Sequence, residues 1–320
     1  MTTKHLVDPE LAAMLDYIPA TTLTAEILPQ VRAMSRTSVD LSPSPTFSIS
    51  EHFIPSPEGS PDVRVLVYRP NQIQGAAPAL MWLHGGGYIM GSADGEDAML
   101  KSILSAVGCA AVAVDYRLAP ETPYPGPLED CYAALKWLTN HADDLGIDPN
   151  RIAVGGSSAG GGLAAALALL ARDRGEFSLM FQFLIAPMID DRTCTLAQPH
   201  PYTGEFIWTR EANRFGWTSL LGHEPGGADV PPYAAVARAE NLEGLPAAFI
   251  NVGAIDLFLE EDMEYARRLI RAGVPTELHV YPGAYHGFRM VADAQVTQAA
   301  QQDQLNALKR AFDLYKGSTK

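Results

Sequence analysis

From Leu80 onward, short apolar runs alternate along the chain with longer segments of helical periodicity. Most of the short runs are followed closely by Gly, Pro, Asp or His, as expected for buried parallel strands. We interpret the following runs as strands: 80–83, 110–114, 151–154, 180–185, 247–252 and 277–281. Helical patterns lie between and after them at 97–106, 128–140, 158–172, 260–272 and 297–315. This alternation predicts an α/β fold whose mostly parallel central sheet is covered by helices on both faces.

The region before this alternation carries the pattern of an edge hairpin. Val63, Val65 and Val67 alternate with other residues over 62–68, and a strand-like run at 47–54 precedes them. We expect the two runs to pair as an antiparallel hairpin added to the main sheet.

Two segments do not follow the alternation. Residues 1–45 carry helical stretches, the first of which starts with Asp8 as a cap and Pro9 in the first turn. Residues 187–225 form a polar, proline-bearing loop with a helix near 209–221. We expect both segments to form a helical cap, the alternative being that the N-terminal segment only packs on the outside. The predicted organisation is 1–45 as the N-terminal part of the cap, 46–186 and 226–320 as the α/β domain, and 187–225 as the cap insertion.

Charge and composition exclude several classes of function. The formal net charge is −14, whereas nucleic-acid binding needs clustered Lys and Arg, so we expect no nucleic-acid partner. The longest apolar stretch, 160–171, is shorter than the roughly 20 residues that span a bilayer. The N-terminal MTTKHLVDPE lacks the apolar core of a secretory signal, and Cys109, Cys131 and Cys194 show no metal-binding spacing. We therefore expect a cytoplasmic protein with reduced thiols, no metal and no cofactor.

The segment Gly156-Ser157-Ser158-Ala159-Gly160 fits the pattern G-x-S-x-G and lies between a strand-like run and a strong helical pattern. In this context the serine sits on a sharp strand-to-helix turn, at a helix N-terminus where the dipole favours negative charge. We interpret Ser158 as a catalytic nucleophile. The alternatives are a glycine-rich turn without chemistry and a phosphate-binding loop, although the lysine of a P-loop is missing.

A serine hydroxyl is a poor nucleophile until a base takes its proton. In α/β folds with a G-x-S-x-G turn the chain order is serine, then acid, then histidine. His286 lies in the loop after the run 277–281 and is our candidate base, whereas His279 falls within that run.

The base in turn needs a carboxylate that fixes its tautomer. Asp256 follows the run 247–252 by a short loop, which predicts that it lies at the same sheet edge as Ser158 and His286. Its alternative role is a helix cap or a first-turn acid, and Asp190 and Asp191 are reserve candidates.

A second glycine-rich segment, His84-Gly85-Gly86-Gly87, can supply backbone N–H groups for an oxyanion. Glycine lets the backbone approach a ligand closely, so Gly86 and Gly87 are candidate donors, together with Ala159 after the nucleophile. We expect His84 to be a structural hydrogen-bonding residue.

Several motifs in this order resemble the hormone-sensitive-lipase-like branch of the α/β-hydrolases, over about residues 60–315. The motifs are His84-Gly85-Gly86-Gly87, the run 115–121 with Tyr124-Pro125, the run 156–161, the Asp256 segment and His286-Gly287-Phe288. The resemblance implies an α/β-hydrolase fold, the triad Ser158, Asp256 and His286, and an oxyanion hole from Gly86, Gly87 and Ala159. It also implies a cap built from the N-terminal helices and residues 187–225, and it suggests a homodimer, through the edge strand near 277–281.

The chain departs from the family pattern at two places. Ser157 stands before the nucleophile where the family has an acid or a threonine, and Asp256 is followed by leucine rather than proline. Leu257 or Phe258 could therefore wall the acyl pocket. Further candidate pocket residues are Tyr88, Phe206, Trp208 and Phe288, with ordinary core packing as the alternative for each. We expect Asp115, Arg117 and Glu121 to form a buried ion network that supports the oxyanion loop.

The predicted function is a carboxylesterase that hydrolyses small to medium apolar esters through an acyl-enzyme. An amidase or deacetylase would use the same triad, and a ligand-binding protein without catalysis could use the same fold. The predicted partner is thus a small-molecule ester. We expect no membrane-spanning segment in the chain.

Overall fold

A single sheet organises the part of the chain that the computed structural model describes, residues 2–17, 22–35, 37–42, 44–55 and 60–314. Eight strands of these residues pair in the order β1-β2-β4-β3-β5-β6-β7-β8. They are β1 Phe47–Ile54, β2 Val63–Pro70, β3 Ala77–Leu83, β4 Ala110–Asp115, β5 Ile147–Ser157, β6 Phe181–Ile185, β7 Ala247–Gly253 and β8 Thr276–Tyr281. Strand β2 pairs antiparallel with β1 and β4, and the remaining pairs are parallel. The predicted parallel sheet and edge hairpin are confirmed.

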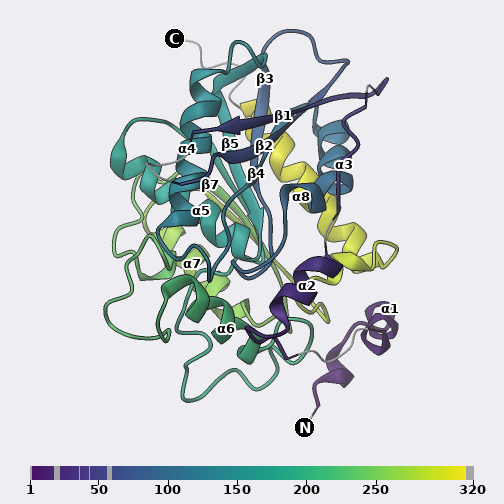
Figure 1. Cartoon of the computed structure of the whole chain (residues 1–320). Coiled ribbons are helices and arrows are strands. Elements are labelled where there is room, and N and C mark those ends of the chain that lie inside the picture. The colour runs from purple at the N-terminus through teal and green to yellow at the C-terminus, as the bar shows by residue number, and fades with distance from the viewer. Residues whose placement is uncertain (1, 18–21, 36, 43, 56–59, 315–320) are drawn as a thin grey trace.

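Helices cover both faces of this sheet (Figure 1). They are α1 Pro9–Ala12, α2 Leu28–Met34, α3 Asp97–Val107, α4 Gly126–Asn140, α5 Ala159–Arg174, α6 Arg210–Leu221, α7 Leu259–Arg271 and α8 Gln295–Leu314. On one face, Leu100 of α3 and Leu308 of α8 share a core cluster with Trp82 of β3. Helices α4, α5 and α7 pack on the other face, where Leu135 and Leu269 belong to the larger cluster. The α/β-hydrolase architecture places both layers as the alternation predicts.

Strand β3 begins three residues before the predicted run 80–83, and this extra part contains a proline. Pro78 cannot donate a ladder hydrogen bond, and the register with β5 shifts between Ala77 and Ala79. The sequence pattern therefore did not predict that the strand includes the residues on both sides of Pro78. At the other end of the chain, Tyr315 of the predicted last helix lies outside the described residues.

The N-terminal segment packs against the loop that follows β8. Helix α1 is a single turn with Asp8 as its cap, whose side chain accepts from the Glu10 N–H at 2.8 Å, as predicted. The Asp8 N–H donates to the Gly283 carbonyl at 3.0 Å, and the Tyr285 hydroxyl donates to the Leu11 carbonyl at 3.1 Å. The first turns of the chain thus lie beside the loop that carries His286.

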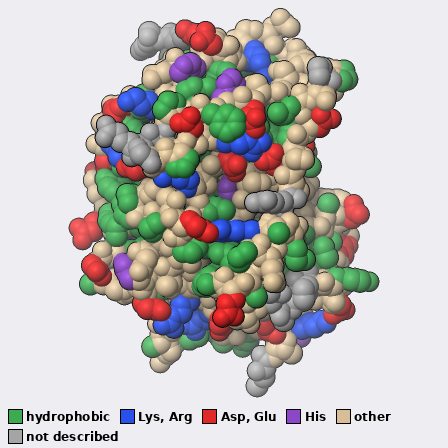
Figure 2. Space-filling model, in the orientation of Figure 1, with side chains coloured by type: hydrophobic (Ala, Val, Ile, Leu, Met, Phe, Trp, Pro, Cys, Tyr) green, Lys and Arg blue, Asp and Glu red, His purple; other side chains and the backbone are tan. Residues whose placement is uncertain are grey.

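The surface in Figure 2 shows acidic and basic side chains interspersed, with no extended patch of one sign on the face drawn. Within the described ranges, no helix combines the length and the apolar character needed to cross a membrane.

Candidate active site

The turn from β5 into α5 holds Ser158 in a strained backbone conformation. Ser158 is the N-cap of α5, with φ 56° and ψ −123°, a region that residues other than glycine rarely occupy. A Cβ on Gly160 would lie 2.1 Å from the Leu83 carbonyl oxygen, and one on Gly156 would lie 2.3 Å from the Gly160 backbone. Small residues at these positions therefore let the strand and helix approach around the serine.

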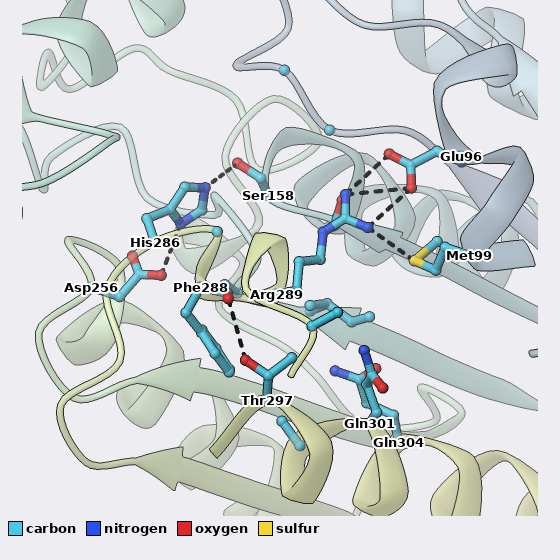
Figure 3. A pocket seen from close by; sticks show the side chains of 18 of the residues that line it. Glu96, Met99, Ser158, Asp256, His286, Phe288, Arg289, Thr297, Gln301 and Gln304 are labelled. Carbon is cyan, nitrogen blue, oxygen red and sulfur yellow. Dashed lines mark hydrogen bonds and ion pairs between the residues drawn. The ribbon is translucent and has the colours of Figure 1, made fainter. Parts of the chain in front are cut away.

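Three side chains from different loops form one hydrogen-bonded row at this turn (Figure 3). His286 Nε2 lies 3.0 Å from Ser158 Oγ, and His286 Nδ1 lies 2.8 Å from Asp256 Oδ2. A carboxylate only accepts hydrogen bonds, so Nδ1 carries the proton, and Nε2 is left to accept from the serine hydroxyl. This is the arrangement in which an imidazole can take the serine proton.

The carboxylate of Asp256 is fixed by the chain around it. Asp256 is 1% exposed, and its second oxygen, Oδ1, accepts from the Phe258 N–H at 3.0 Å. The Phe258 ring packs edge-on against the His286 ring, with centroids 5.1 Å apart. Both the acid and the imidazole are therefore held in place by the residues that begin α7.

Asp190 and Asp191 are not placed to serve the imidazole. Asp191 accepts from Arg238 at 2.6 and 2.9 Å, and Asp190 accepts from Arg192 at 2.7 Å. Both carboxylates are thus bound to arginines, and the reserve assignment is wrong for this structure.

Backbone N–H groups gather beside Ser158 from two elements. Gly86 and Gly87 have φ of 123° and 60° in the turn after β3, and Ala159 is the first residue of α5. No hydrogen bond between described residues uses the N–H of these three residues. A Cβ on Gly87 would lie 2.1 Å from Trp208 Cη2, so only glycine leaves room for the indole here. The three predicted donors thus lie at one site.

His84 supports the glycine-rich turn, as expected. Its Nδ1 lies 2.8 Å from the Gly85 carbonyl oxygen, and its ring stacks on Tyr116 at 4.2 Å. The Tyr116 hydroxyl donates to the His84 carbonyl at 2.7 Å. Burial lowers the pKa of His84 below its ordinary value, so this imidazole stays neutral.

The predicted single ion network around the oxyanion loop is wrong. Arg117 pairs with the buried Asp130 at 2.6 Å, whereas Asp115 lies 3.4 Å from Arg64. Glu121 is exposed and pairs with Arg32 of α2 at 2.7 Å. The three predicted charges thus have different partners, and Arg64 also pairs with Glu51 and Asp94 at 2.5 Å each.

Arg32 is the residue of this group that touches the oxyanion loop. It donates through Nε to the Ile89 carbonyl at 2.6 Å and through one terminal nitrogen to the Ala119 carbonyl at 2.7 Å. The Ile89 N–H in turn donates to the Gly86 carbonyl at 3.0 Å. Helix α2 is therefore tied to the glycine-rich turn.

A cavity of about 610 Å³ opens beside Ser158 and is lined by the triad residues and by Gly86 and Gly87. Of the predicted pocket residues, Trp208 and Phe288 line it. Within the described residues, 1–45 contribute nothing to its wall, and Trp208 is the contribution of 187–225.

The other four predicted pocket residues lie elsewhere, because their side chains pack into the core. Tyr88 is 1% exposed and donates to the Met188 carbonyl at 2.7 Å. Phe206 packs against Tyr285, Leu257 against the backbone of residue 204, and Phe258 behind His286. Their assignment as pocket walls is corrected.

Sequence reasoning missed the second half of the cavity wall. It is formed by η3 Ala93–Glu96, α3, η5 Phe288–Met290 and α8, through residues that include Glu96, Met99, Arg289, Gln301 and Gln304. Their spacing in the sequence predicts that they share one face of α3 and one face of α8. No local pattern indicates that these faces border a cavity. The described residues hold no cluster of three or more His, Cys, Asp or Glu side chains arranged for a metal ion.

Comparison with known proteins agrees with this geometry. Residues 80–290 match the model of a family described by its alpha/beta hydrolase fold. Esterase LipI of Mycobacterium tuberculosis is 34% identical over 300 residues, covering 93% of this chain and 92% of the relative. Carboxylesterase NlhH of the same organism is 36% identical over 318 residues, covering 96% of each chain.

Solved structures are similar over nearly the whole chain. A bacterial heroin esterase superposes with a TM-score of 0.89 at 39% identity, covering 97% of this chain and 99% of the other. Esterase LipW from Mycobacterium marinum superposes with a TM-score of 0.82 at 33% identity, covering 97% of each chain. With the fold, the motifs and these relatives in agreement, the chain belongs to the hormone-sensitive-lipase-like branch of the α/β-hydrolase family.

Proposed function

We propose that this chain is a carboxylesterase that hydrolyses small to medium apolar esters with Ser158 as nucleophile, His286 as base and Asp256 as the acid that orients the base. The observation that carries the proposal is the hydrogen-bonded row from Asp256 through His286 to Ser158, with distances of 2.8 and 3.0 Å. The esterase names of the similar proteins support an ester rather than an amide as the substrate.

A side chain or a backbone N–H group can be assigned to each step of the reaction. His286 Nε2 takes the Ser158 proton as Oγ attacks the ester carbonyl, and Asp256 stabilises the imidazolium that forms. The N–H groups of Gly86, Gly87 and Ala159 hold the oxyanion of the tetrahedral intermediate. The imidazolium then protonates the leaving alcohol, which leaves an acyl group on Ser158. Water, activated by His286, releases the acid and restores the hydroxyl.

Replacement of the nucleophile tests the proposal. Ser158→Ala should lower kcat for p-nitrophenyl acetate by roughly 10⁴–10⁶, because no other group at the site can carry the acyl intermediate. Ser105→Ala, at an exposed serine of α3 outside the cavity wall, is the matched control. Turnover by freshly purified Ser158→Ala at the rate of the unaltered chain would refute the assignment.

Two further measurements separate the alternatives. A matched ester and anilide of the same acid distinguish an esterase from an amidase, with the ester expected to react faster. An organophosphate should label Ser158, which is detected in the peptide that contains it. An unlabelled serine would favour a ligand-binding protein without catalysis.

Three expectations stay predictions. Residues 187–225, which place Trp208 at the cavity, together with 1–45, are proposed as the cap. The homodimer through β8 and the cytoplasmic location are untested.

A further inference from the structure

The cavity beside Ser158 continues into a second arm between α3 and α8. Met99 and Ile103 of α3 line one side of this arm, and Gln301, Gln304 and Leu305 of α8 line the other. Met99, Ile103 and Leu305 make part of this wall apolar, and the two glutamines add polar atoms to it. The wall of this arm therefore offers both apolar surface and polar atoms to a ligand.

An ion pair with spare hydrogen-bonding capacity crosses the arm. Arg289 of η5 reaches Glu96 of η3 at 3.3–3.4 Å and Met99 Sδ at 3.1 Å (Figure 3). These distances exceed the roughly 2.7–2.9 Å of a good charge-assisted hydrogen bond. Among the described residues, the Arg289 Nε–H has no acceptor, and Glu96 has no donor besides Arg289. The guanidinium is thus able to donate to a further oxygen.

Two amides face the same space. Gln301 and Gln304 lie three residues apart on α8, so they share one face of the helix. Figure 3 shows their side chains on the same side of α8, toward the cavity. No hydrogen bond between described residues uses either amide, whereas the neighbouring Gln302 donates to Asn306 at 2.9 Å. Both amides can therefore donate an N–H to a ligand.

The charge of the pair decides which ligand oxygen fits. The Glu96 side chain is 8% exposed and carries a negative charge that Arg289 balances. A second carboxylate would leave one negative charge in excess beside a buried carboxylate, which is costly. A neutral carbonyl oxygen accepts the free N–H groups without changing the balance.

On the basis of the proposed carboxylesterase function, we propose that Arg289, with Gln301 and Gln304, selects esters whose end remote from the scissile bond carries a neutral carbonyl oxygen. Plain alkyl esters contact the apolar side chains of the arm but leave its N–H donors without an acceptor. Esters that end in a carboxylate are rejected by Glu96.

Matched esters test this selection. One series consists of p-nitrophenyl esters of six to ten carbons that end in an alkyl chain, in a carbonyl at the penultimate carbon or in a carboxylate. A second series carries the same three ends on the alcohol of an acetate ester, so that either half of the ester can occupy the arm. In one series the carbonyl ester should exceed the alkyl ester in kcat/KM by about tenfold, as expected for a charged donor. The carboxylate ester should fall below both.

Two variants should change the preference among the carbonyl, alkyl and carboxylate esters. Glu96→Gln leaves Arg289 uncompensated, so the ratio of carboxylate to alkyl ester should rise at least tenfold. The double variant Glu96→Gln with Arg289→Met should lower the carbonyl-to-alkyl ratio at least threefold, because only the neutral amides remain as donors. Gln302→Ala, on the same helix but outside the cavity wall, is the control and should keep the original ratios.

The ratios are taken within each variant, so a general loss of activity cancels, and organophosphate labelling of Ser158 shows that each variant has a folded site. Equal kcat/KM for carbonyl and alkyl esters at every length in both series would overturn the inference. A carbonyl-to-alkyl ratio in the double variant equal to that of the unaltered chain would do the same. If the unaltered chain neither hydrolyses p-nitrophenyl acetate nor is labelled, the carboxylesterase proposal fails instead.

Discussion

His286 is held at both ring nitrogens, and its tautomer depends on Asp256. In Asp256→Asn, the amide can donate to Nδ1, which places the ring proton on Nε2 and blocks acceptance from Ser158. We expect kcat for p-nitrophenyl acetate to fall by roughly 10⁴ at neutral pH, as in other triads. Thermal unfolding serves as the folding control, and a fall of less than tenfold would argue against the assigned acid.

At the scale of single residues, the sequence predicted the three triad residues better than the residues that line the cavity. Ser158, Asp256 and His286 follow from local motifs and chain order, and the structure brings their side chains together. The pocket walls depend on which way neighbouring side chains point, and this is decided by tertiary packing. Leu257 and Phe258 are buried, whereas Arg289, one residue after Phe288, reaches across the cavity to Glu96.

Among the elements, α2 is tied to the glycine-rich turn after β3 through one arginine. Arg32 donates to two backbone carbonyls and to the exposed carboxylate of Glu121. An exposed ion pair contributes little, so Glu121→Gln should change the free energy of unfolding by less than about 1 kcal/mol. Arg32→Gln leaves two carbonyls without their donor and should lower it by about 1–3 kcal/mol, with a lower kcat. Urea unfolding and steady-state kinetics measure both; equal effects of the two variants would contradict this account.

Helix α7 contains a buried carboxyl group that should make stability depend on pH. Asp262 is fully buried, and neither of its oxygens has a hydrogen-bond partner among the described residues. Burial raises the pKa of Asp262 well above its ordinary value, with smaller contributions from the charges of Glu261 and Asp256. Above the pKa of about 3.9 in the unfolded chain, the unfolded state loses this proton first, so stability falls as pH rises.

Asp262→Asn removes this contribution. We expect the free energy of unfolding to fall less between pH 5 and pH 8 in the variant than in the unaltered chain. Urea unfolding at both pH values measures the difference. The same fall in both proteins would mean that Asp262 is ionised in the folded state.

In the molecule as a whole, the first turns of the chain pack against the loop that carries His286. Leu11 is fully buried in a cluster with Tyr285, next to His286. Leu11→Ala should lower the free energy of unfolding by about 2–5 kcal/mol, as for other buried leucines. Leu6→Ala, at a residue that is 38% exposed, is the control and should have a much smaller effect. Chemical denaturation compares the two, and equal losses would show that Leu11 is not part of the core.

The layered arrangement of the whole molecule could be predicted, because alternating strands and helices leave few ways to cover a parallel sheet. The contact between Leu11 and Tyr285 could not, because it joins residues 274 positions apart and depends on how two loops meet. The shape of the cavity was missed for the same reason, since α3 and α8 become neighbours only in the folded sheet.

This long-range contact has a consequence for biosynthesis. The ribosome releases Leu11 and Asp8 long before residues 283 and 285, to which they bind. Until both segments have been made, the loop that carries His286 therefore lacks the contacts with Asp8 and Leu11 that hold it in the folded chain.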